Sequence, residues 1–157
     1  MRTFKRIVNR LKKNNKTISF MESCTGGLLS NSITNIPGAS EVFHFGAVTY
    51  SNSFKELMGV SKETINKYTV YSMETAKEMS KSICNYTKSN YGVGITGKIN
   101  REDPNNMSGS NNHVFISIYD NDKDCYCNFE LDTIPGTRLQ NKNMILNEVI
   151  NQLEIII

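Results

Sequence analysis

The sequence predicts an α/β fold in which helices cover both faces of a mixed sheet. Helical patterns alternate with strand patterns through the first part of the chain, as expected for parallel strands joined by helices. Two strand patterns, at residues 113–119 and 125–131, then flank a polar turn and predict an antiparallel hairpin. The chain has 157 residues, of which 38% are hydrophobic and 21% charged, so we expect residues 1–157 to form a single domain.

The elements of the N-terminal part follow from hydrophobic periodicity and from residues that end helices. A helix is predicted from Phe4 onward, because apolar residues recur there at the i, i+3, i+4 and i+7 positions. Residues 17–21 predict a short buried strand, and residues 28–36 predict a second helix that ends at Pro37. Side chains alternate over residues 43–50, which predicts a second strand.

The middle of the chain is predicted to hold helices, one strand and a long loop. Residues 53–58 and 61–67 predict two short helices, and residues 72–86 predict a longer one that Ser72 can cap. Residues 92–96 predict a third strand. The polar residues 98–112 predict a long loop, and long loops inside compact domains are often functional. The hairpin follows, and a last helix is expected after Pro135-Gly136.

Charge and cysteine spacing exclude several classes of function. The net charge is +3, and the only dense basic stretch, residues 2–16, is interpreted as the solvated face of a helix, so no nucleic-acid partner is expected. No signal peptide follows Met1 and no apolar run is long enough for a membrane span, so we expect a cytoplasmic protein without a membrane partner. The four cysteines, Cys24, Cys84, Cys125 and Cys127, show no CxxC spacing, so neither a zinc site nor a redox motif is expected.

The first candidate site is the segment 22–27, where a predicted strand enters a helix. Its small residues, Gly26 and Gly27, let a ligand approach the backbone, but a tight turn with close packing explains them equally well. Ser23 and Cys24 are possible nucleophiles in this segment. The thiol ranks below the serine hydroxyls, because no histidine partner for it is evident.

The second candidate group gathers at the carboxyl ends of the predicted strands. Lys55 follows Tyr50 by five residues and can reach back over the sheet edge, where a desolvated lysine can take a proton from a serine hydroxyl. An exposed surface lysine is the alternative. Thr96 ends the third strand at the same edge, which is where ligands bind in open α/β sheets. Arg138 can hold a phosphate bidentately or be a surface arginine.

Together these segments resemble the CinA C-terminal domain family. The matching segments are ESCTGGL at 22–28, PGAS at 37–40, VTYSN at 48–52 with Lys55, LMGV at 57–60 and GITG at 94–97. The resemblance runs from about residue 17 to the C-terminus. It implies a three-layer α/β/α fold, a homo-oligomer, and the activity of a nicotinamide mononucleotide deamidase (PncC). That enzyme hydrolyses its small mononucleotide substrate to nicotinic acid mononucleotide and ammonia in pyridine nucleotide recycling, without a cofactor or metal.

The resemblance also implies residue roles, since the family is described as serine amidohydrolases with a Ser–Lys dyad. The lysine corresponds to Lys55, and the nucleophile to Ser40 or Ser23, of which Ser40 is slightly favoured. The other serine hydroxyl, with Tyr50 and Thr96, is expected to orient the substrate or stabilise the oxyanion. The implied substrate-binding residues are Thr25, Gly26, Gly27, Thr96 and Arg138, with Arg138 on the phosphate.

The chain departs from the family pattern after Gly97. The family continues with a Gly-Pro-Asp-Gly-Gly-like loop, whereas residues 98–106 read KINREDPNN. Glycines permit backbone conformations that other residues resist, so contacts made by this loop are expected to differ. The alternative hypothesis is therefore a catalytically impaired nucleotide-binding or regulatory module that keeps the fold.

Overall fold

The structure is a computed structural model, and it describes residues 2–157. Five strands form one sheet with the order β2-β1-β3-β4-β5. β1 pairs in parallel with β2 and β3, whereas β4 pairs antiparallel with β3 and β5, so the predicted mixed sheet is confirmed. The strands are β1 (Ile18–Glu22), β2 (Phe43–Val48), β3 (Tyr91–Gly97), β4 (His113–Asp120) and β5 (Cys125–Asp132).

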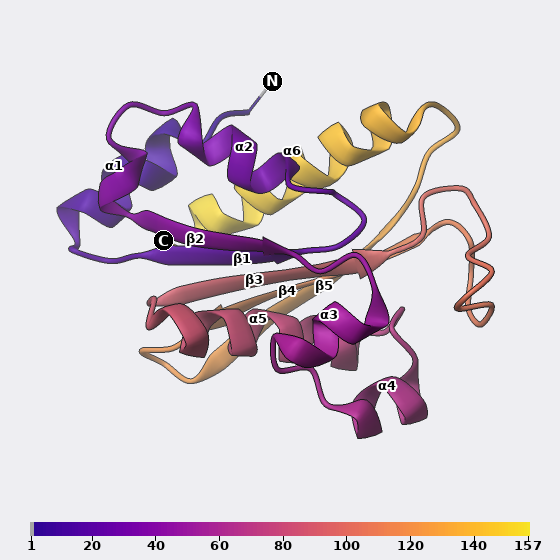
Figure 1. Ribbon diagram of the computed structural model, residues 1–157. Coiled ribbons are helices and arrows are strands. Elements are labelled where there is room, and N and C mark those ends of the chain that lie inside the picture. Colours follow the sequence, from indigo (N-terminus) through magenta and orange to yellow (C-terminus); the bar gives the residue numbers. More distant parts are fainter. Residues whose placement is uncertain (1) are drawn as a thin grey trace.

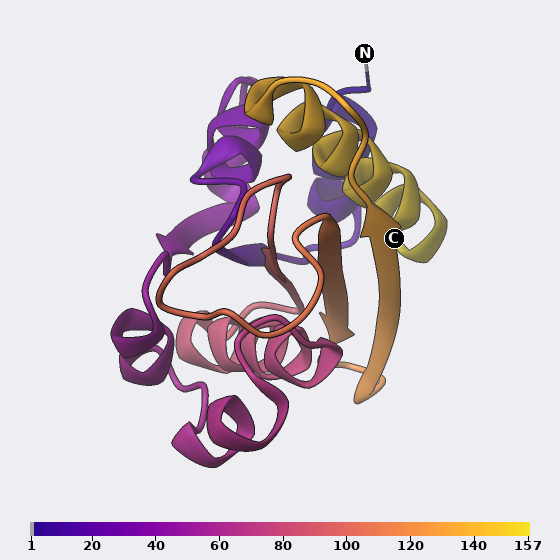
Figure 2. The same cartoon turned by 90° about the vertical axis from the view of Figure 1, so that its right-hand side faces the viewer.

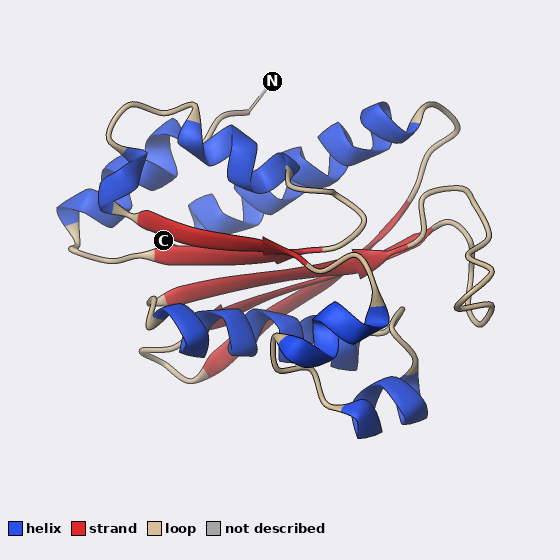
Figure 3. Cartoon of the chain, in the orientation of Figure 1, coloured by secondary structure: helices blue, strands red, loops and turns tan. Residues whose placement is uncertain are grey.

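Helices cover both faces of the sheet, which confirms the three-layer α/β/α architecture (Figures 1 and 3). One face carries α1 (Lys5–Lys13), α2 (Leu28–Thr34) and α6 (Arg138–Ile156). The other face carries α3 (Asn52–Leu57), α4 (Lys62–Tyr68) and α5 (Met73–Thr87). A short 3₁₀ helix, η1 (Ala39–Glu41), precedes β2 and was not predicted, because one such turn is too short to show a hydrophobic period.

The alternation of side chains along β3 explains how both layers pack. Val93 and Ile95 point into the main core, which they share with residues of α1, α2 and α6. Gly92 and Gly94 point to the other face, where a Cβ on Gly94 would lie 2.4 Å from the carbonyl oxygen of Ala76 in α5. The absence of side chains at these positions therefore lets α5 lie almost directly on the sheet.

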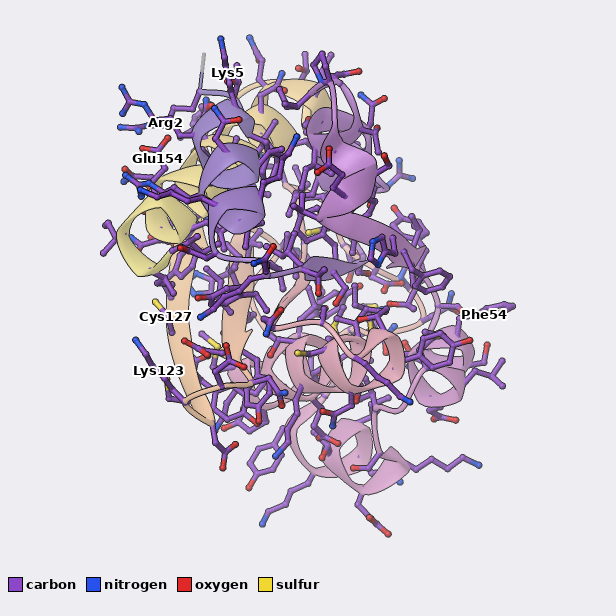
Figure 4. The ribbon with its side chains drawn as sticks, turned by 90° about the vertical axis from the view of Figure 1, so that its left-hand side faces the viewer. Arg2, Lys5, Phe54, Lys123, Cys127 and Glu154 are labelled. Carbon is purple, nitrogen blue, oxygen red and sulfur yellow. The ribbon has the colours of Figure 1, made fainter. Side chains whose placement is uncertain are left out.

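The basic N-terminal stretch behaves as a solvated helix face. α1 buries Ile7, Val8 and Leu11 and leaves its basic residues exposed. Arg2 Nη1 lies 3.4 Å from Glu154 Oε2 on α6, and Figure 4 shows the two side chains next to each other at the surface. None of the helices in the described part of the chain combines the length and apolarity that a bilayer crossing needs.

The parallel strands β1, β2 and β3 end at the same edge of the sheet. β2 ends at Val48 rather than at Tyr50 as predicted, although the Thr49 N–H still donates to the Glu22 carbonyl at 2.8 Å. The segment after β3, residues 98–112, crosses in front of this edge (Figure 2). Side chains that follow these strands therefore meet at one place.

Candidate active site

A pocket of about 920 Å³ opens at the carboxyl edge of β1, β2 and β3. Open α/β sheets bind their ligands at this edge, and the volume suits a small-molecule site. Five segments form its walls: Ser23 and Cys24 after β1, residues 50–54 around the start of α3, Tyr71 before α5, most of residues 97–106, and Arg138 at the start of α6.

A serine and a lysine lie in contact at the bottom of this pocket. Lys55 Nζ is 3.1 Å from Ser23 Oγ and donates to the Thr49 carbonyl oxygen at 2.8 Å. Ser23 lines the pocket, whereas Lys55 lies behind it and is only 2% exposed. The ammonium does not point into bulk water, so the expected Ser–Lys contact is present, with Ser23 as its serine.

Burial gives Lys55 the properties of a proton acceptor. Its pKa is lowered from 10.5 to about 8, because burial disfavours the charged form more than Cys24 and Asp103 favour it. A lysine with this pKa has a neutral fraction near neutral pH, and its nitrogen lone pair can then accept the Ser23 hydroxyl proton.

The helix that carries the lysine reverses the usual burial pattern. Lys55 is the buried residue of α3, whereas its neighbours Phe54 and Leu57 are 59% and 74% exposed. Lysine is almost never fully buried without a reason, and apolar side chains normally take the inner face. Ser51 caps the helix by accepting from the Phe54 N–H at 3.3 Å. The short helix therefore holds Lys55 inward at an energetic cost, which is typical of a functional site.

A buried carboxylate fixes the turn that carries Ser23. Glu22 is fully buried and accepts from the Leu29 and Ser30 N–H groups at 2.9 and 3.0 Å, at the start of α2. It also accepts from the Thr25 and Ser30 hydroxyls at 2.8 Å each. Glu22 was not among the predicted site residues. Its position at the end of a predicted strand, just before a helix, could have indicated this role, because a carboxylate is stabilised at a helix N-terminus.

Ser40, the slightly favoured nucleophile in the prediction, does not lie near Lys55. Ser40 is exposed in η1, which precedes β2 and therefore lies at the amino end of that strand. Lys55 follows the carboxyl end of β2 and contacts Ser23. Since the two serines lie at opposite edges of the sheet, the structure does not bring Ser40 to the pocket.

Four other expected substrate-binding residues do not line the pocket. The Thr96 hydroxyl is buried and donates to the Val70 carbonyl at 2.7 Å, so it positions the segment before α5. The Thr25 hydroxyl is bound to Glu22. Gly26 and Gly27 have φ of 61° and 97°, a left-handed region that favours glycine, so the tight-turn interpretation explains both.

Tyr50 and Arg138 do line the pocket, at its rim. Tyr50 is 66% exposed, and its hydroxyl lies 3.5 Å from Arg138 Nη2. Arg138 Nη1 also donates to the Ile99 carbonyl at 3.1 Å, which orients the guanidinium beside the pocket. The Tyr50 hydroxyl therefore belongs with the arginine and not with the Ser23–Lys55 pair.

Cys24 also faces the pocket but is a poor nucleophile. Burial raises the pKa of its thiol to about 12, against the opposing effect of the Lys55, Arg138 and Lys142 charges. The reactive form of cysteine is the thiolate, so this side chain stays unreactive near neutral pH.

The long loop is held over the pocket by polar contacts that sequence analysis did not identify. The Tyr71 hydroxyl donates to Asp103 Oδ2, and Asn106 Nδ2 donates to the same oxygen at 3.0 Å. Asn106 and Asn52 also exchange amide hydrogen bonds of 2.9 and 3.1 Å. Burial raises the pKa of Tyr71, and the bond to Asp103 raises it further. The polar composition of residues 98–112 indicated a functional loop but not these partners.

Known proteins resemble this chain in sequence and in fold. The model of the CinA C-terminal domain family matches residues 2–157. A putative competence-damage inducible protein of Clostridium acetobutylicum is 40% identical over 141 residues, covering 86% of this chain and 32% of that protein. A protein with the same description from Thermoanaerobacter sp. (strain X514) is 46% identical over 92 residues, covering 58% of this chain and 22% of that protein. The chain thus spans about a third or less of the length of these relatives.

Solved structures share the architecture. A CinA superfamily protein from Klebsiella pneumoniae 700603 superposes with a TM-score of 0.85 at 18% identity, covering 95% of this chain and 91% of that chain. The competence/damage inducible protein CihA from Agrobacterium tumefaciens gives a TM-score of 0.81 at 27% identity, covering 96% of this chain and 89% of that chain.

Proposed function

This chain belongs to the CinA C-terminal domain family, and from that premise we propose that it is an amidohydrolase acting on nicotinamide mononucleotide. The products are nicotinic acid mononucleotide and ammonia, as in pyridine nucleotide recycling. The observation that carries the proposal is the contact between the buried Lys55 amine and the Ser23 hydroxyl on the pocket floor. We further propose a cytoplasmic homo-oligomer.

The proposed reaction begins with proton transfer. Neutral Lys55 takes the Ser23 hydroxyl proton, and the oxygen attacks the carboxamide carbon. Backbone N–H groups in the turn after Ser23, which Glu22 holds in place, stabilise the developing oxyanion. Lys55 then returns the proton to the leaving ammonia, and water hydrolyses the ester on Ser23. Burial of the lysine matches its pKa to this exchange at neutral pH.

The rest of the pocket fits a mononucleotide. Arg138 stands at the rim with its guanidinium oriented by the Ile99 carbonyl, and a planar guanidinium holds phosphate bidentately. The Tyr50 hydroxyl beside it offers a further contact to the phosphate or ribose. The substrate then lies with its amide over Ser23 and its phosphate at Arg138.

Ammonia release from nicotinamide mononucleotide by the purified protein tests the proposal. Ser23→Ala should abolish turnover, whereas Ser40→Ala is the matched control and should retain it, because Ser40 is exposed outside the pocket. Folded wild-type protein that releases no ammonia, beside a working control enzyme, would reject the proposed function.

The alternative function is a nucleotide-binding or regulatory module without turnover. It is favoured by the loop at residues 98–112, which departs from the family pattern and is anchored by its own contacts through Asp103 and Asn106. Its signature is binding of nicotinamide mononucleotide by the wild type without ammonia release. Measuring both quantities on one preparation decides between the two functions.

A further inference from the structure

The pocket wall contains a carboxylate that is fixed in place but not neutralised. Asp103 Oδ2 accepts from the Tyr71 hydroxyl and from Asn106 Nδ2, and Oδ1 accepts from the Asn105 N–H at 3.0 Å. All three donors are uncharged. Within residues 2–157, Asp103 takes part in no ion pair. A carboxylate has about four acceptor sites, so Oδ1 keeps one free for a ligand.

Asp103 is ionised at neutral pH. Partial burial raises the pKa of its carboxyl, but the hydrogen bonds from Tyr71, Asn106 and Asn105 and the charge of Lys98 outweigh it, so the pKa is lowered. Lys98 does not pair with the carboxylate. Its ammonium donates to the Ser108 carbonyl at 3.0 Å and lies 5.0 Å from the centre of the Tyr71 ring.

Hydrogen bonds also connect the Asp103 carboxylate to the helix that carries Lys55. Asn106, which binds Asp103, exchanges amide hydrogen bonds with Asn52 in the first turn of α3, the helix that carries Lys55. The charge of Asp103 acts on the Lys55 amine, whose pKa it raises against the effect of burial. Asp103 and Tyr71 thus lie together in the pocket wall, which also includes Lys98 and Arg101, and the Asp103 carboxylate is the acceptor that stays free for a cationic ligand.

We propose that Asp103 selects substrates whose ring carries a positive charge, an inference that rests on the proposed function. The nicotinamide of a mononucleotide is a pyridinium cation, because the ring nitrogen bears the glycosidic bond. The Asp103 carboxylate beside this ring stabilises the cation by charge complementarity. The reduced mononucleotide has the same amide, ribose and phosphate but a neutral dihydropyridine ring, so Asp103 discriminates against it.

The proposal is tested by binding to the Ser23→Ala protein, in which the nucleophile is absent. Calorimetry measures the affinities for nicotinamide mononucleotide and for its reduced form, before and after the further change Asp103→Asn. The charged ligand is expected to bind about tenfold more weakly without the Asp103 charge, and the neutral ligand within twofold of its original affinity.

Glu102→Gln provides the matched control. Glu102 lines the same pocket but is exposed, and no side-chain hydrogen bond or ion pair holds it within the described residues, so solvent screens its charge. Removing that charge is expected to change neither affinity more than twofold.

The two affinities and the ammonia assay together show whether Asp103 recognises the charged ring, whether it only holds the loop, and whether the protein is an amidohydrolase. Equal weakening of both ligands by Asp103→Asn would overturn the proposal, because Asp103 would then only hold the loop. Unchanged affinity for both ligands would also overturn it. If wild-type protein releases no ammonia while Asp103→Asn still weakens only the charged ligand, the proposed function fails and recognition of the cationic ring stands.

Discussion

Replacing Lys55 by methionine removes the ammonium buried between Ser23 and Thr49, and its effect on stability should depend on pH. The Lys55 side chain is 2% exposed, and its pKa is lowered from 10.5 to about 8, chiefly by burial. At 1.36 kcal/mol per pKa unit, holding this lysine protonated costs the folded state about 3 kcal/mol. The substitution keeps a long side chain and removes that cost.

The sign of the pH effect follows from the lowered pKa. Between about pH 8 and pH 10.5 the unfolded chain keeps a proton on Lys55 that the folded chain has lost. The free energy of unfolding of the wild type therefore rises with pH through this window, and below pH 8 the whole cost remains. The difference between wild type and Lys55→Met should thus grow in favour of the wild type by about 3 kcal/mol from pH 7 to pH 10.5.

Urea unfolding at several pH values from 7 to 10.5 measures this difference, since groups common to both proteins cancel. The lost hydrogen bond to the Thr49 carbonyl contributes about 1 kcal/mol at every pH, so the change with pH is the readout. Lys62→Met, at an exposed lysine of α4, is the control and should parallel the wild type. Parallel curves for Lys55→Met and wild type would show that Lys55 keeps an ordinary pKa, and its role as base would fall.

Three further predictions concern the same region. Lys55→Met should lower turnover at least about a hundredfold in the ammonia assay, and wild-type kcat/KM should rise with pH up to about 8; near-normal turnover would remove the lysine from the mechanism. Glu22→Gln should lower the free energy of unfolding by about 2 kcal/mol in urea titrations, because the amide NH₂ group cannot accept the hydrogen bonds that the Leu29 and Ser30 N–H groups donate at the start of α2. An unchanged free energy of unfolding would refute this role of Glu22. Phe54→Asp should shift the proposed homo-oligomer toward monomers in sedimentation experiments, because exposed apolar side chains gather on α3 and the edge strand β2 and Figure 4 shows Phe54 pointing outward. An unchanged sedimentation coefficient would show that this surface is not the contact between subunits.

The periodic elements of this fold were accessible from the sequence. Apolar spacing in residues 4–11 reflects the burial of one helix face in the core, which also stabilises the helix. Residues 43–48 form the predicted strand, although the burial of their side chains does not alternate along this edge strand. The short helix η1 was not predicted, and β2 ends at Val48 rather than at Tyr50. Neither a single helical turn nor the last residues of a strand show a hydrophobic period from which they could be predicted.

Only some of the residues that gather at the candidate site could be placed there from the sequence, and the misplacement of Ser40 could have been avoided. Ser40 precedes a strand that is parallel to its neighbour, whereas Lys55 follows that strand, so topology alone puts them at opposite edges of the sheet. Thr96 was misplaced because its hydroxyl points toward the Val70 backbone, a long-range partner that the strand pattern does not reveal. The Tyr71–Asp103 contact joins residues 32 apart through an aperiodic loop, and nothing local in the sequence specifies it.

If Ser23 is the nucleophile, its hydroxyl beside the buried Lys55 amine becomes acylated during turnover. Rapid quenching of the wild type with nicotinamide mononucleotide, followed by peptide mass spectrometry, locates any ester formed. We expect a pyridine-carboxyl ester on the peptide containing Ser23, and none in the Ser23→Ala protein. An ester on Ser40, or full ammonia release by Ser23→Ala, would contradict it.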